Sequence, residues 1–170
     1  DRARAGAVFA DGPARDLVQR LKYGDRPDLA RPMGRWMARA GRELLAGADA
    51  VAPVPMHRGR LWSRRFNQAA ALAQAVAEAA GVRLEATTLA RVKATRPQVG
   101  LSRAERAANL QGAFRAPKGA FAGRRVVLVD DVATTGATLN AAARALRRAG
   151  AESVDALVFA RVVSHGPLTI

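Results

Sequence analysis

The segment VVLVDDVATTGATL, from Val126 to Leu139, is the most informative part of the sequence for the fold. Its first four residues form a continuous apolar run, which is typical of a strand buried on both faces of a parallel sheet. Asp130 and Asp131 follow, and small and hydroxyl-bearing residues then lead into a helical pattern over about Ala137–Ala149. The stretch therefore predicts a buried strand, a tight turn beside two carboxylates, and a helix.

The turn between this strand and this helix has the composition of a phosphate-binding loop. Small residues let a ligand approach the backbone, and Gly136 can adopt backbone angles that are closed to other residues. Free N–H groups with a helix dipole behind them attract an anion, and the three threonines add hydroxyl donors. The loop has no lysine, unlike a Walker A loop, and no G-x-G-x-x-G motif accompanies it. We expect it to hold a phosphate through Val132, Ala133, Thr134, Thr135, Gly136, Ala137 and Thr138.

The two aspartates suggest what carries that phosphate. Carboxylates accept hydrogen bonds from a vicinal diol, and they hold Mg²⁺ directly or through water. A phosphate and a diol about one sugar apart describe ribose 5-phosphate, so Asp130 and Asp131 are the candidate sugar and Mg²⁺ ligands. The structural alternative is that an aspartate only caps the turn, since threonine- and glycine-containing loops before helices are common. The complete strand–turn–helix run favours the ligand site.

The rest of the chain predicts an open α/β sheet. The expected elements are helices over Ala14–Tyr23, about Asp28–Leu45 and Asn67–Ala80, and strands over Ala50–Val54, Leu84–Val92, Ala113–Arg115 and Val154–Val162. In such a sheet, ligands bind beyond the carboxyl ends of the strands. Within the second helix, Met33, Trp36 and Met37 recur at helical spacing, and we expect all three to lie in the core.

Composition bounds the partners of the chain. Twenty-eight basic residues against 14 acidic ones give a net charge of +14, and all but three of the basic residues are arginine. Such a surface attracts nucleic acid or a small anionic substrate, although a GC-rich coding sequence would produce the same arginine bias. The lack of cysteine excludes disulfides and thiolate zinc sites and is compatible with a cytoplasmic protein. The apolar runs are too short and broken for a membrane span.

The central stretch resembles the phosphoribosyl pyrophosphate motif of type I phosphoribosyltransferases. Three further segments narrow the resemblance to the ComF/GntX competence family: LKYGDRPDLARPMGRWMA (Leu21–Ala38), VAPVPMHRGRLWSRRFNQAAALA (Val51–Ala73) and TRPQVGLSRAERAANLQGAF (Thr95–Phe114). With the central stretch they run in family order across most of the chain. The resemblance implies one domain over residues 1–170, with a mainly parallel twisted sheet, flanking helices and a small hood region.

The resemblance also implies roles for particular residues. Asp130 and Asp131 would be the catalytic pair that binds the ribose hydroxyls with Mg²⁺, and residues 132–138 would bind the 5-phosphate. Pyrophosphate would be bound by Met56, His57, Arg58 and Arg60, and by Arg96, Gln98, Arg103, Arg106 and Asn109 on closure of a mobile loop over about residues 93–111. The implied reaction is displacement of pyrophosphate from phosphoribosyl pyrophosphate by a nitrogen nucleophile, whose identity no segment reveals. The family further implies a role in DNA uptake, and a homodimer is common for such folds.

Two departures from the family pattern accompany the resemblance. Family members usually begin with a cysteine-rich, zinc-ribbon-like segment, which is absent from these residues, and Arg65 stands where the family tends to have glycine. The loop around Arg65 is rich in arginine and flanked by Trp62 and Phe66. It would neutralise pyrophosphate, contact single-stranded DNA with its aromatics stacked on bases, or simply be solvated. A non-catalytic DNA-binding or ligand-sensing module is therefore the alternative function.

Overall fold

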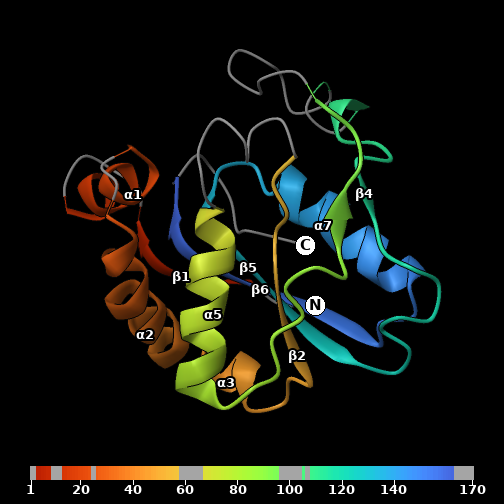
Figure 1. The fold of residues 1–170 in the computed structure, drawn as a ribbon, viewed down its shortest axis with the longest axis horizontal. Coiled ribbons are helices and arrows are strands. Elements are labelled where there is room, and N and C mark those ends of the chain that lie inside the picture. Colours follow the sequence, from red (N-terminus) through yellow and green to blue (C-terminus); the bar gives the residue numbers. More distant parts are fainter. Residues whose placement is uncertain are drawn as a thin grey trace.

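The structure is a computed structural model that describes residues 3–8, 13–23, 26–57, 67–95, 105 and 108–162. Its centre is a four-stranded sheet in the order β1-β6-β5-β2 (Figure 1). The strands are β1 (Ala3–Val8), β2 (Ala50–Pro53), β5 (Arg125–Ala133) and β6 (Ser153–Arg161). Every neighbouring pair is parallel. The predicted parallel α/β sheet is confirmed.

Helices cover both faces of this sheet, and a small hairpin-like sheet stands beside it (Figure 1). The helices are α1 (Pro13–Tyr23), η1 (Pro27–Leu29), α2 (Ala30–Ala40), α3 (Arg42–Leu45), α5 (Gln68–Ala80) and α7 (Ala137–Arg148). The small antiparallel sheet joins β3 (Ala90–Arg91) to β4 (Phe114–Arg115). No helix in the described ranges combines the length and apolar character that a bilayer crossing requires.

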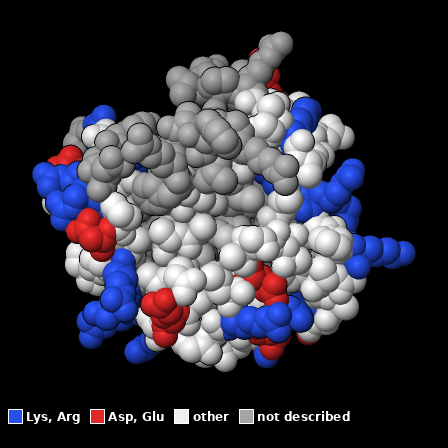
Figure 2. All heavy atoms as spheres, viewed as in Figure 1, with Lys and Arg blue, Asp and Glu red and all other residues white. Residues whose placement is uncertain are grey.

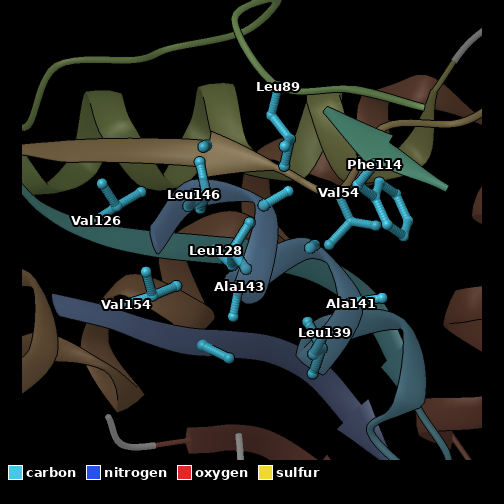
Figure 3. Close-up of a cluster of buried hydrophobic side chains, with 14 of the residues drawn as sticks. Val54, Leu89, Phe114, Val126, Leu128, Leu139, Ala141, Ala143, Leu146 and Val154 are labelled. Carbon is cyan, nitrogen blue, oxygen red and sulfur yellow. The ribbon is translucent and has the colours of Figure 1, made fainter. Parts of the chain in front are cut away.

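The unbroken apolar run of β5 is explained by burial on two sides. Val126 and Leu128 pack into the cluster beneath α7, shown in Figure 3, which also contains Phe114 and Leu139. Val127 and Val129 belong to the opposite cluster, under α1, α2 and α5. Successive side chains of a strand point to opposite faces, so a strand covered on both sides needs apolar residues at every position.

The helix predicted over Asn67–Ala80 is confirmed as α5, and a local signal defines each of its ends. Asn67 is the N-cap, and its Oδ1 accepts a hydrogen bond from the Ala69 N–H at 3.1 Å. Gly81 ends the helix in the left-handed conformation with φ 67°, a geometry that glycine adopts without a Cβ clash. The cap matters for the site, because it fixes where the N-terminus of α5 points.

Two predictions in the N-terminal half are wrong. The helix expected over residues 28–45 is divided at Gly41, where an added Cβ would lie 2.8 Å from Leu157 Cδ1. Trp36 is not a core residue, because its side chain is 57% exposed. Met33 and Met37 are buried as predicted. The buried stripe is completed by Ala30 and Gly34 at i, i+3, i+4 and i+7 spacing, and Trp36 falls outside it.

The strand boundaries also differ from those predicted. The extended segment 84–92 reduces to β3 and one isolated bridge between Leu84 and Val51. β5 continues past the acids to Ala133, so both aspartates belong to the strand itself. The sequence analysis assigned no strand to Ala3–Val8, yet these residues form β1 by pairing with β6.

Candidate functional site

The sheet opens at the carboxyl ends of β2 and β5, and a cavity of about 290 Å³ lies there. β2 pairs with β5 only as far as Pro53 opposite Val129. On its other side, β5 stays paired with β6 up to Ala133 opposite Arg161. The last residues of β5 therefore lie at an open edge. The cavity is lined by Lys22, Val54, Pro55, Met56, Asn67, Gln68, Ala69, Arg91, Asp130, Asp131, Val132, Thr134 and Thr138.

Two carboxylates from β5 form the floor of this cavity. Asp131 Oδ2 lies 2.9 Å from Nζ of Lys22, at the end of α1. The Asp131 N–H donates to Asp130 Oδ1 at 2.9 Å, and the Val132 N–H donates to Asp131 Oδ1 at 2.6 Å. Each carboxylate thus keeps one oxygen on the backbone, and a cation partner is seen for Asp131 but not for Asp130 among the described residues.

The electrostatics of the two acids differ for the same reason. Loss of solvation, followed by the nearby charge of Asp131, raises the pKa of Asp130 from 3.8 to about 8. Lys22 opposes this rise but does not cancel it. The folded protein therefore favours the protonated form of Asp130 until a cation or a hydrogen-bond donor arrives to stabilise the carboxylate.

The turn from β5 into α7 presents an uncapped helix N-terminus to the same cavity. Gly136 is the N-cap residue with φ 74° and ψ 0°, and no side chain caps the helix. The first turn of α7 contains no acidic residue. Thr134 and Thr138 line the cavity. The buried Oγ1 of Thr135 has no hydrogen-bond partner in the described part of the chain. Such a turn provides N–H and O–H donors that an anion would satisfy.

A second helix N-terminus reaches the cavity from the side of β2. Asn67, Gln68 and Ala69, at the start of α5, all line it. Gln68 is only 2% exposed, and its Nε2 has no hydrogen-bond partner among the residues described. A buried amide without a partner costs free energy unless a ligand pairs with it. The first turn of α5 also lacks acidic residues.

The residues predicted for the site fall into three groups. Asp130, Asp131, Val132, Thr134, Thr138 and Met56 line the cavity. Thr135, Gly136 and Ala137 form the turn, while Ala133 is buried in the core and His57 and Asn109 lie away from the lining. The remaining predictions lie outside the described residues: Arg58, Arg60, Arg64, Arg65, Trp62, Phe66, Arg96, Gln98, Arg103 and Arg106.

Sequence reasoning missed four polar lining residues, which are Lys22, Asn67, Gln68 and Arg91. The sequence offered one clue to Lys22, because it is one of only three lysines among 28 basic residues. The sequence offered no clue to Arg91, because its position at the cavity depends on the pairing of β3 with β4. Its guanidinium lies 5.5 Å from the ring centroid of Phe114 on β4 and donates to Thr95 Oγ1. The small sheet thus holds one cation over the cavity.

Comparisons with known proteins agree with this architecture. The family model of the phosphoribosyl transferase domain matches residues 67–166. Competence protein F of Haemophilus influenzae is 36% identical over 156 residues, which are 88% of this chain and 68% of that protein. The DNA utilization protein YhgH of Salmonella typhimurium is 36% identical over 153 residues, covering 86% of this chain and 66% of that protein. This chain spans about two thirds of the length of these relatives.

Two solved structures share the fold. The allosteric regulatory enzyme of purine biosynthesis gives a TM-score of 0.54 at 26% identity, over 83% of this chain and 30% of that one. Glutamine phosphoribosylpyrophosphate amidotransferase from B. subtilis gives 0.51 at 24% identity, over 82% of this chain and 30% of that one. The predicted type I phosphoribosyltransferase fold is therefore confirmed. The chain belongs to the phosphoribosyl transferase domain family and, within it, to the family of Competence protein F and the DNA utilization protein YhgH.

Proposed function

We propose that the chain binds phosphoribosyl pyrophosphate together with Mg²⁺ in the cavity between β2 and β5, and that it acts as a phosphoribosyltransferase. One observation carries this proposal. Two helix N-termini without acidic residues in their first turns meet the same cavity, and two carboxylates lie on its floor. Phosphoribosyl pyrophosphate is a ribose with a phosphate at one end and a pyrophosphate at the other. Each anion would lie at one helix N-terminus, and the ribose hydroxyls between them would lie at the two carboxylates.

The turn before α7 is the proposed site of the 5-phosphate. Its helix dipole, the exposed Thr134 and the lining Thr138 favour an anion. The hydroxyl of Thr135, which has no partner among the described residues, would donate a hydrogen bond to a phosphate oxygen. Hydrogen bonds to a charged partner contribute roughly 1.5–3 kcal/mol each, so a few of them hold a phosphate without a lysine.

The N-terminus of α5 is the proposed site of the pyrophosphate. The unpartnered Nε2 of Gln68 would donate a hydrogen bond to the pyrophosphate. Arg91 lines the same cavity and would add a positive charge. Contacts at the N-terminus of α5 would make phosphoribosyl pyrophosphate a better ligand than ribose 5-phosphate, which has no pyrophosphate group. Ribose 5-phosphate would leave the buried Gln68 amide unsatisfied.

The residues present fit a Mg²⁺ ion that is delivered with the ligand. Mg²⁺ is usually bound by one or two carboxylates together with substrate phosphates and waters. The described residues contain no group of three or more acidic or histidine side chains that would hold a metal alone. Asp130 and Asp131 would supply the protein ligands, directly or through water, and the ion would neutralise the pyrophosphate as it leaves.

The proposed reaction is attack of a nitrogen nucleophile on the anomeric carbon, with the carbon–oxygen bond to pyrophosphate breaking. Asp130 and Asp131 would hold the ribose hydroxyls, and the α7 turn would anchor the far end of the sugar. Fixing both ends leaves the anomeric carbon in position, and positioning of this kind accounts for a large part of catalytic rate. Donors aimed at the leaving group stabilise the charge that develops there.

The relatives' names add the cellular setting of the proposal. One relative is named for competence and the other for the utilization of DNA. We propose that this chain acts in the cytoplasm on a step linked to DNA uptake.

Calorimetric titration with phosphoribosyl pyrophosphate and Mg²⁺ tests the binding. The wild-type chain should bind, and the Asp130→Asn/Asp131→Asn variant should lose binding while it remains folded, which a cooperative melting transition checks. Asp16→Asn/Asp28→Asn is the matched control, because both of those aspartates are exposed. Unchanged affinity in the Asp130→Asn/Asp131→Asn variant would contradict the assignment of the site.

Turnover is tested separately by measuring pyrophosphate release in the presence of nucleobases or ammonia. Release that depends on one acceptor and disappears in Asp130→Asn/Asp131→Asn would establish the transferase activity. Tight binding without release for any acceptor would identify a ligand-sensing domain instead.

A further inference from the structure

The outer face of α2 carries a stripe of arginines that the proposed site does not use. Arg31, Arg35 and Arg39 recur every four residues, and all three are exposed. Arg42, at the start of α3, is exposed as well. Blue side chains lie along the left margin of the space-filling view, where Figure 1 places α1 and α2 (Figure 2). We call Arg31, Arg35, Arg39 and Arg42 the α2 stripe.

The arginines of the α2 stripe are not occupied by ion pairs of the kind that hold several other arginines of the described residues. Arg124 and Arg125 form ion pairs with Glu85 and Asp49, at 2.8 and 3.4 Å. Arg26 likewise pairs with Asp28 at 2.7 Å. Within the described ranges, no ion pair is found for any arginine of the α2 stripe. Four adjacent guanidinium groups thus keep their full donor capacity.

Trp36 lies on the same exposed half of α2. It is 57% exposed, and it is the larger of the two large hydrophobic side chains exposed among the described residues. Because Trp36 and Arg39 are three residues apart on a helix, their side chains are neighbours. Beside the stripe, a groove of about 430 Å³ runs between α2, α3 and the end of α5. Arg35, Arg39 and Arg42 line this groove together with Ala38, Leu45, Ala46, Ala79 and Ala80.

We infer that this face binds a single-stranded nucleic acid, with the α2 stripe on successive phosphates and Trp36 stacked on a base. Residues four apart on a helix are separated by about 6 Å along the axis, which is close to the repeat of an extended single strand. Arginine pairs well with phosphate because its planar fork donates two hydrogen bonds at once. An exposed indole needs an unstacked base, and single strands offer one while duplexes do not.

This inference does not depend on the proposed phosphoribosyl pyrophosphate site. Apart from the start of α5, the cavity is lined by Lys22, Arg91, three residues that follow β2, and residues of β5, α7 and the turn between them. The α2 stripe belongs to α2 and α3 and shares no lining residue with that cavity. The Asp130→Asn/Asp131→Asn variant should therefore bind nucleic acid normally. The two proposals can fail independently.

Fluorescence anisotropy with a labelled 20-nucleotide oligo(dT) tests the inference. The change is Arg31→Gln/Arg35→Gln/Arg39→Gln, with folding checked by melting temperature. The control is Arg115→Gln/Arg144→Gln/Arg148→Gln, which removes three exposed charges from β4 and α7. Each phosphate contact on a single strand contributes about −0.7 to the slope of log affinity against log salt. The α2 variant should weaken binding at least tenfold and flatten that slope by about 2. Equal losses in both variants would show only a net-charge effect and overturn the inference.

A second measurement reports on stacking directly. The chain has two tryptophans, Trp36 and Trp62. Trp62→Phe therefore leaves Trp36 as the only indole, and oligo(dT) should quench its fluorescence as it saturates. Trp36→Ala should lower the affinity about tenfold or more, as removal of one base-stacking side chain does. Binding without quenching would contradict the proposed contact.

The remaining measurements use unlabelled oligo(dT), oligo(rU) and a 20-base-pair duplex as competitors of the labelled oligo(dT). Oligo(dT) displaced best by DNA single strands would assign the surface to DNA, and displacement by oligo(rU) at lower concentration would assign it to RNA. Either result upholds single-strand recognition. A duplex that competes as well as a single strand, nucleotide for nucleotide, would overturn it.

Discussion

At the scale of single residues, the candidate site is built around an acid that is destabilised in the free protein. Asp130 loses solvation on folding and lies next to Asp131, so its pKa is raised to about 8. Asp131 is relieved by Lys22 at 2.9 Å, whereas no such cation reaches Asp130 in the described residues. The fold therefore bears a cost that a sugar hydroxyl or a Mg²⁺ ion would relieve on binding.

This cost predicts how stability depends on pH. Below about pH 4, Asp130 is protonated in both states and costs nothing. Between about pH 4 and 8 the unfolded chain loses this proton and the folded chain keeps it, so Asp130 makes the free energy of unfolding fall as pH rises. Asp130→Asn should therefore raise the melting temperature at pH 8 by about 2–4 °C, for roughly 1 kcal/mol in a chain of this size. The gain should vanish near pH 4, and a variant less stable than wild type at pH 8 would contradict this account.

Gln68 provides a second prediction at this scale. Its buried amide has no partner among the described residues and lines the proposed pyrophosphate end of the cavity. Gln68→Ala should weaken phosphoribosyl pyrophosphate binding by about 10-fold or more, which matches the loss of a hydrogen bond to a charged group. Binding of ribose 5-phosphate should change far less. Gln74→Ala is the matched control, because Gln74 lies on the exposed face of the same helix and bonds only to Glu78, at 2.6 Å, in the described residues.

At the scale of elements, sequence patterns predicted the strands and helices whose formation depends on residues close together in the chain. The continuous run of β5, the glycine before α7 and the helix over Asn67–Ala80 each depend on a few neighbouring residues. The sequence did not predict β1, because alanine and glycine have low strand propensity. The strand forms through its pairing with β6, which is distant in the sequence. Trp36 was misplaced because helical spacing alone does not say which side of a helix meets the sheet.

The same reasoning explains why the site was only partly predictable. Asp130, Asp131 and the α7 turn are consecutive, so one stretch of sequence revealed them. Lys22, Gln68 and Arg91 come from three other elements, and only the packing of those elements brings them to the cavity.

The contact between α2 and α5 gives a prediction for packing. An added Cβ on Gly34 would lie 2.4 Å from the Cβ of Ala75 and 3.2 Å from the Leu72 carbonyl oxygen. Backbone atoms cannot move aside cheaply, so Gly34→Ala should destabilise the fold by about 1–3 kcal/mol despite the better helix propensity of alanine. The melting temperature reports this loss. Gly47→Ala is the control, since its Cβ would meet only the Arg125 side chain at 3.4 Å, and an equal loss there would reject the packing explanation.

At the scale of the whole molecule, function follows from where the sheet stops pairing. β2 leaves β5 at Pro53, and the gap brings two helix N-termini and two carboxylates around one cavity. The net charge of +14 gives the whole molecule a positive field, which would attract an anionic ligand. The α2 stripe lies outside the cavity, so one molecule has room for a small phosphorylated sugar and for a nucleic-acid strand.

The most direct measurement is a crystal structure of the protein grown with phosphoribosyl pyrophosphate and Mg²⁺. We expect electron density for the 5-phosphate on the turn over residues 134–138, for the ribose hydroxyls on Asp130 and Asp131, and for the pyrophosphate beside Gln68. Ligand density at another place on the molecule, or an empty cavity with Asp131 still paired to Lys22 at saturating ligand, would contradict it.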